Sequence, residues 1–111
     1  MEEAMKEKIT QLQLFEQKMQ MNMQQKQQLQ ARVVELDSAL TEIEGKDEAY
    51  KIIGNIMVKS DPKNLKKDLT EKKEVISIRL DSITKQEDKL KEQAESLQKE
   101  VQEAMKGGEN G

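Results

Sequence analysis

The sequence predicts a mainly α protein, in which two long helices form an antiparallel coiled coil that is joined at its base by one short β-hairpin. Charged residues make up 37% of the 111 residues, while one Phe, one Tyr and no Trp leave little material for a globular core. Apolar residues recur at heptad spacing in two long stretches, which argues against the disorder that such a composition could also indicate. Between these stretches, residues 50–59 have strand character.

The first helix is expected over residues 4–44, where neither Pro nor Gly interrupts the chain. Nine of its twelve heptad seam positions are apolar. We interpret the polar residues Asn22 and Lys26 as devices that fix register and partner choice, the alternative being a seam that is loose there. The a positions are Met5, Leu12, Met19, Lys26, Val33 and Leu40, and the d positions are Lys8, Phe15, Asn22, Leu29, Leu36 and Ile43.

The hairpin is expected over residues 50–59, after Gly45 has ended the first helix in a left-handed cap. Gly54 and Asn55 favour a two-residue turn, because Gly takes positive φ without cost and Asn tolerates it. Both faces are then apolar near the turn. An isolated two-stranded sheet is marginal in water and leaves both edges unpaired, so this segment needs partners. The expected register pairs Tyr50 with Lys59, Lys51 with Val58, Ile52 with Met57, and Ile53 with Ile56.

The second helix is expected over residues 62–106, because Asp61 can cap it and Pro62 suits the first helical position. A flexible tail at 107–111 completes a single domain over residues 1–111. Each helix would be about 60 Å long at 1.5 Å per residue, so both chain ends should meet at a tip far from the hairpin. The seam residues of this helix are Leu69, Ile76, Ile83, Leu90, Leu97 and Ala104, with Lys66, Lys73, Leu80, Glu87, Ala94 and Val101 as the companion row.

Composition excludes several classes of function. Without Cys or His the chain lacks thiol nucleophiles, His-dependent triads and Cys/His zinc sites, and it contains no Gly-rich phosphate loop, so we expect neither an enzyme nor a cofactor or metal. A net charge of −3 gives no general attraction to nucleic acid or to an acidic membrane. Residues 59–79 are locally basic, but interleaved acids favour a solvated helix face. With neither a signal peptide nor a membrane span, a cytoplasmic location is expected.

The tip of the coiled coil is a candidate binding surface. Fraying of the two helix ends would expose apolar side chains, and methionine adapts to irregular partners. The alternative is that these side chains only fill the seam. The candidate residues are Met5, Ile9, Leu12, Phe15, Leu97, Val101 and Met105.

Helix, short apolar hairpin and helix is also the plan of the prefoldin family. The segment from Tyr50 to Lys59 resembles the Tyr-Lys-x-x-Gly-x-x-x-Val-Lys core of its β-type subunits. Residues 25–27 and 80–90 resemble the corresponding segments of the two helices in family members. Residues 102–107 resemble the end of its archaeal members. The likeness spans nearly the whole chain, and the hairpin carries most of its specificity.

The resemblance implies a hexamer of two α-type and four β-type subunits, in which hairpins join in a β-barrel platform. It also implies an ATP-independent chaperone that holds unfolded proteins at the coiled-coil tips and transfers them to a group II chaperonin. For subunit assembly we expect Ile52, Ile53, Ile56, Met57 and Val58, and for client binding the tip residues named above. A structural or scaffolding coiled coil is the alternative function, but it has no use for an Ile-rich hairpin.

Overall fold

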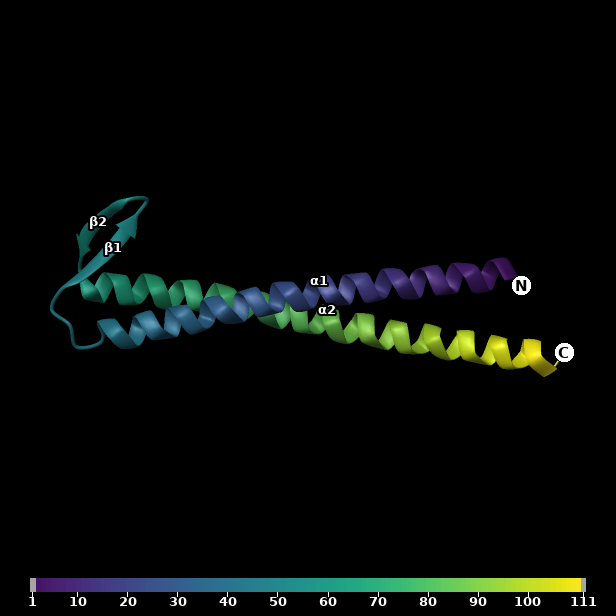
Figure 1. The fold of residues 1–111 in the computed structure, drawn as a ribbon. Coiled ribbons are helices and arrows are strands. Elements are labelled where there is room, and N and C mark those ends of the chain that lie inside the picture. Colours follow the sequence, from purple (N-terminus) through teal and green to yellow (C-terminus); the bar gives the residue numbers. More distant parts are fainter. Residues whose placement is uncertain (1, 111) are drawn as a thin grey trace. The chain divides into compact units, whose positions relative to one another are not determined.

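The computed structural model describes residues 2–110, and their order is helix, strand, strand, helix (Figure 1). The elements are helix α1 (Glu2–Ile43), strand β1 (Ala49–Ile53), strand β2 (Ile56–Ser60) and helix α2 (Pro62–Asn110). They divide into two compact units: unit 1 contains residues 1–26 and 82–111, and unit 2 contains residues 27–81. Within each unit a stretch of α1 packs antiparallel against a stretch of α2 (Figure 1). The predicted fold class is confirmed.

The ends of the elements differ from expectation by a few residues. Helix α1 begins two residues earlier than predicted and ends one earlier, and each strand is one residue longer. Helix α2 continues to Asn110, so residues 107–110, expected as a flexible tail, are helical. A glycine costs a helix about 1 kcal/mol relative to Ala, and no proline follows Gly107 to stop it. Gly111 lies outside the described residues.

The hairpin of unit 2 has the predicted register, from Tyr50 opposite Lys59 to Ile53 opposite Ile56, and one further pair, Ala49 with Ser60. Gly54 has a φ of 61°, and among the described residues no non-glycine has positive φ. Of the two turn residues, only the first, Gly54, therefore has a left-handed backbone conformation, which is the pattern of a type II′ turn. Asn55 does not adopt positive φ.

Both expected helix boundaries beside the hairpin are present in unit 2. Gly45 has a φ of 72°, and the N–H of Lys46 donates to the carbonyl of Ile43 at 3.2 Å, which closes α1. At the start of α2, the Asp61 carboxylate accepts a hydrogen bond from the N–H of Lys63 at 3.2 Å. The Asp61 carbonyl also accepts from the N–H of Leu65 at 2.9 Å, so Asp61 is the helix cap.

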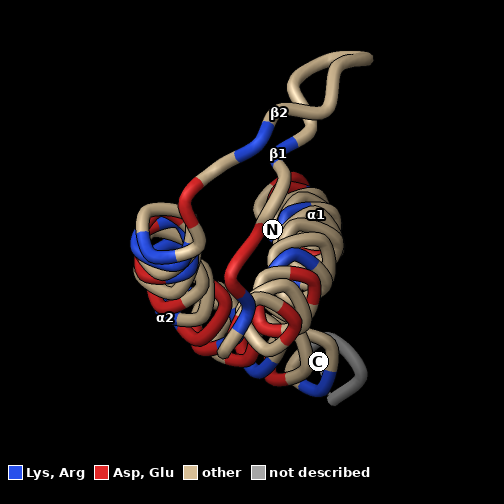
Figure 2. Tube along the Cα trace, turned by 90° about the vertical axis from the view of Figure 1, so that its left-hand side faces the viewer, with Lys and Arg blue, Asp and Glu red and all other residues tan. Residues whose placement is uncertain are grey.

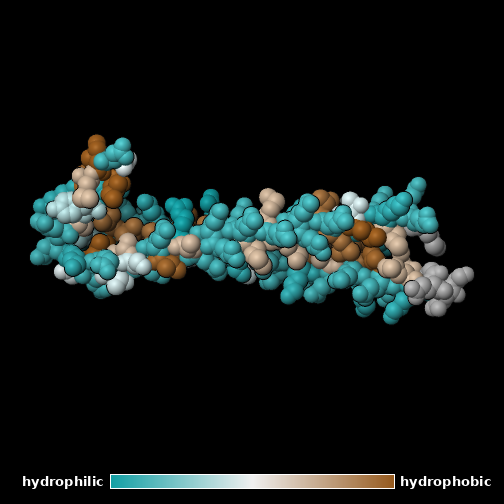
Figure 3. Space-filling model, in the orientation of Figure 1, coloured by the Kyte–Doolittle hydropathy of each residue, from teal (hydrophilic) through white to brown (hydrophobic). Residues whose placement is uncertain are grey.

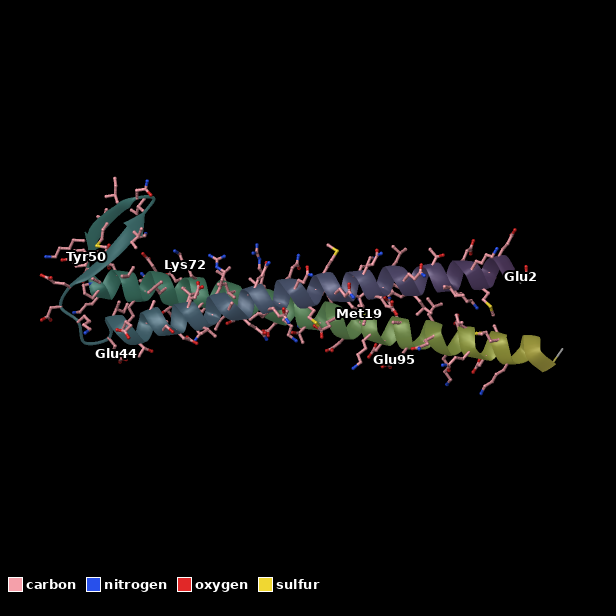
Figure 4. All side chains as sticks on the ribbon, in the orientation of Figure 1. Glu2, Met19, Glu44, Tyr50, Lys72 and Glu95 are labelled. Atoms are coloured by element: carbon pink, nitrogen blue, oxygen red, sulfur yellow. The ribbon has the colours of Figure 1, made fainter. Side chains whose placement is uncertain are left out.

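The seam of α1 follows the predicted heptads. All twelve predicted positions are half-buried, and Asp37 and Ala39 are the other half-buried residues of the helix. No residue of α1 is fully buried. The half-buried Met19 is labelled in Figure 4. The burial that holds α1 in place is therefore spread evenly along it.

The seam of α2 is deeper, with Ile76, Ile83 and Val101 buried, but it departs from prediction at both ends. Leu65 is half-buried in place of Lys66. The half-buried residues 65, 69 and 73 are each four positions apart, a spacing that suits an eleven-residue repeat in this part of the helix. Ala104 is exposed, so the buried part of the seam ends at Val101.

Candidate functional site

All five residues predicted for assembly are exposed on the hairpin of unit 2. Between 41% and 70% of the surface of each remains accessible. Figure 3 shows hydrophobic surface, in brown and tan, on the hairpin, and Figure 2 shows no charged residue at its turn end. Burying an Ile, Met or Val side chain fully contributes about 1.5–3 kcal/mol. The hairpin therefore exposes a large amount of apolar surface for its size, and burying this surface would be favourable. The five residues are Ile52, Ile53, Ile56, Met57 and Val58.

Polar contacts fix the base of this hairpin. Lys59 and Tyr50 are cross-strand partners, and both reach Glu48. The Lys59 Nζ atom lies 3.5 Å from Glu48 Oε1, and the Tyr50 hydroxyl donates a hydrogen bond to Glu48 Oε2 at 3.4 Å. All of these groups are exposed, so each contact contributes little stability and chiefly orients the strands. The polar base and apolar turn end divide the hairpin into two zones.

The tip candidates lie in unit 1, where both chain ends are found on the same side (Figure 1). Ile9 and Met105 are exposed, with 41% and 55% of their surfaces accessible. Val101 is buried and becomes available only if the helices separate. The half-buried Lys8 and the exposed Glu100 form an ion pair of 3.5 Å across the helices nearby. The remaining candidates are half-buried in the seam: Met5, Leu12, Phe15 and Leu97.

Several exposed apolar side chains escaped the sequence analysis because they lie outside the heptad seam. On α1 in unit 1, Leu14 and Met21 have half or more of their surface exposed. They are seven residues apart, so they share one heptad position, and this spacing was the signal that could have identified them. The other members of this set are Met23 in unit 1, and Val34, Val75 and Ile78 in unit 2.

Two neighbouring hollows form a groove along one flank of unit 1, which we call the lateral groove. The inner hollow, of about 330 Å³, lies between residues 18–25 and 86–93, with Leu90 in its lining. The outer hollow, of about 380 Å³, lies one heptad closer to the chain ends and is lined in part by Phe15 and Leu97. Gln93 lines both hollows, so the two adjoin at this residue.

No group of three or more acidic, His or Cys side chains suited to a metal ion occurs among residues 2–107, whose side chains the structure describes. In that same range, neither helix contains a stretch long and apolar enough to cross a membrane. The accessible features of the two units include exposed apolar side chains and shallow grooves.

Two long helices that flank one exposed apolar hairpin define a class of coiled-coil proteins with an unpartnered sheet. The prefoldin subunit family matches residues 6–108 of the chain. The chain therefore belongs to the prefoldin family, as its hairpin segment indicates, and is a chaperone subunit rather than an enzyme.

Known relatives agree in sequence and in fold. Prefoldin subunit beta of Thermococcus onnurineus is 36% identical over 99 residues, which cover 86% of this chain and 85% of that protein. The corresponding subunit of Archaeoglobus fulgidus is 35% identical over 100 residues, covering 87% and 86%. The crystal structure of the prefoldin beta subunit from Thermococcus strain KS-1 matches with a TM-score of 0.84 at 34% identity, covering 91% of each chain.

Proposed function

We propose that the chain is a β-type subunit of a hexamer with two α-type and four β-type subunits, which holds unfolded proteins in the cytoplasm. The observation that carries this proposal is the exposure of five apolar side chains on a two-stranded sheet with both edges free. Pairing with other hairpins in a barrel would bury both faces and satisfy the edge N–H and C=O groups. The relatives that match over most of the chain are themselves called prefoldin subunits.

The client-binding surface is assigned to the helix ends of unit 1. Ile9 and Met105 are accessible there as the structure stands, and the half-buried seam residues become accessible when the helix ends separate. Weak apolar contacts of this kind are not selective and suit unfolded chains of many sequences. We propose that holding requires no ATP; in line with this, Gly54 belongs to a turn and not to a Gly-rich phosphate loop. Clients then pass to a group II chaperonin for folding.

Sedimentation of the complex reconstituted with its α-type partner tests the assembly step. Ile53→Asp places a charge where the barrel would bury an apolar side chain, and we expect the large species to be replaced by small ones. Asn55→Asp is the matched control, because it adds the same charge at the turn without removing an apolar group. A scaffolding coiled coil would instead leave the mass of both variants unchanged, and that result would contradict the proposal.

A further inference from the structure

The lateral groove of unit 1 has the hydrogen-bonding chemistry of a peptide site. Four glutamines line it: Gln25 and Gln86 the inner hollow, Gln11 the outer hollow, and Gln93 both. A glutamine amide both donates and accepts hydrogen bonds, so it can pair with the backbone N–H and C=O groups of an extended chain. Folded proteins pair these groups internally, whereas unfolded chains leave them open.

The charges of the groove are divided between its two hollows. Lys18 and Lys89 line the inner hollow, which has no acidic residue in its lining. Glu92 and Glu100 line the outer hollow, which has no basic one. Lys8 partly compensates Glu100 at 3.5 Å, while Lys18, Lys89 and Glu92 form no ion pair with the side chains of residues 2–107. A complementary occupant thus carries an acidic group over the inner hollow and a basic group over the outer one.

The spacing of the hollows sets the spacing of these groups. One heptad along a helix is about 10 Å, which an extended chain covers in about three residues. Apolar side chains between the two charges would meet Phe15, Leu90 and Leu97 on the floor and Met21 at the rim. Met21 has 61% of its surface exposed and its flexible side chain can adapt to different occupants.

We propose that the lateral groove binds an extended polypeptide segment in which an acidic and a basic residue flank about two apolar ones. The proposal deepens the proposed function, on which it rests, by adding a binding site on the flank of the coiled coil to the one at the helix ends. Because its selectivity lies in charge spacing, this site favours particular segments within an unfolded client.

Photo-crosslinking in the full complex locates the client. A benzophenone side chain is introduced at Gln93, which lines both hollows, or at Gln98, an exposed glutamine of the same helix that lines neither. With denatured lysozyme as client, we expect at least about fivefold more adduct from position 93, since a benzophenone reacts only with groups in contact with it. Equal yields from the two positions would overturn the proposal.

Peptide binding tests the charge pattern independently of client holding. Three labelled peptides share two apolar residues and differ in their flanking residues: acid and base, two acids, or two bases. We expect the mixed peptide to bind the complex about threefold more tightly than the other two, because an exposed ion pair contributes only modestly to binding. In the variant with Lys18→Glu and Lys89→Glu, the peptide with two bases should bind best. Equal binding of all three peptides would contradict the proposal.

Different results would refute the groove proposal and the chaperone proposal. A complex that suppresses aggregation of denatured lysozyme but shows neither crosslinking preference nor charge preference refutes the groove and retains the chaperone function. A complex that fails to suppress aggregation yet binds the mixed peptide preferentially refutes the chaperone function and retains the groove.

Discussion

The Nζ atom of Lys26 lies 3.6 Å from Oε2 of Glu87, across the seam of unit 1. This distance makes an ion pair but not a hydrogen bond, and Oε2 is buried without a hydrogen-bond partner among residues 2–107. Each side chain keeps about a third of its surface exposed, which screens the pair. The ion pair brings two polar residues of the two helices together across an otherwise apolar seam. A shift in register would separate them, which favours the interpretation of Lys26 as a register-fixing residue.

Removing the cation alone should therefore destabilise the coiled coil. In Lys26→Leu the Glu87 carboxylate stays in the seam without its partner, and we expect a loss of up to about 1 kcal/mol in urea unfolding followed by circular dichroism. The double variant with Glu87→Leu should recover that loss or exceed the parent, since the seam becomes apolar. A single variant as stable as the double one would show that the pair has no energetic role.

Burial differs sharply between two isoleucines of α2 in unit 2. Ile76 retains 7% of its surface exposed and Ile78 retains 70%. We expect Ile76→Ala to lower the free energy of unfolding by about 2–4 kcal/mol, because it leaves a cavity in the seam. Ile78→Ala, the control on the same helix, should change it by no more than about 0.5 kcal/mol. Urea unfolding at one fixed protein concentration compares the two, and equal losses would contradict the seam assignment.

Sequence periodicity predicted the interior of the fold well, for a definite physical reason. A seam residue must recur every three or four positions to face its partner, so the pattern from Met5 to Ile43 left little freedom. Hairpin register followed in the same way from Gly54, which fixed the turn and with it each cross-strand pair.

Features that depend on the depth of packing could not be predicted in this way. Ile83 and Leu97 share one heptad position, yet Ile83 is buried and Leu97 only half-buried. The exposed Leu14 and the groove beside Gln93 arise on the flanks, where the seam pattern carries no information. Helix ends were missed for a related reason, because glycines such as Gly107 weaken a helix without stopping it.

Glycine has opposite roles at the turn and in α2. A Cβ at Gly54 would meet nothing within 4 Å, so the expected cost of Gly54→Ala is backbone strain at a φ of 61°. We expect a loss of about 1–2 kcal/mol in hairpin stability, seen as weaker assembly in sedimentation. Gly107→Ala also meets nothing within 4 Å but lies in a helix, and should stabilise it by up to about 1 kcal/mol. Unchanged assembly in Gly54→Ala would contradict the type II′ turn.

The helix ends of unit 1 offer a test that separates client binding from stability. Ile9 is exposed, so Ile9→Ser should leave urea unfolding within about 0.5 kcal/mol of the parent. If Ile9 contacts clients, the same change should reduce suppression of lysozyme aggregation, because it removes apolar surface from the binding site. Val101 is buried, and Val101→Ser should instead lower stability by more than about 1 kcal/mol. Full chaperone activity in a stable Ile9→Ser complex would remove Ile9 from the client-binding surface.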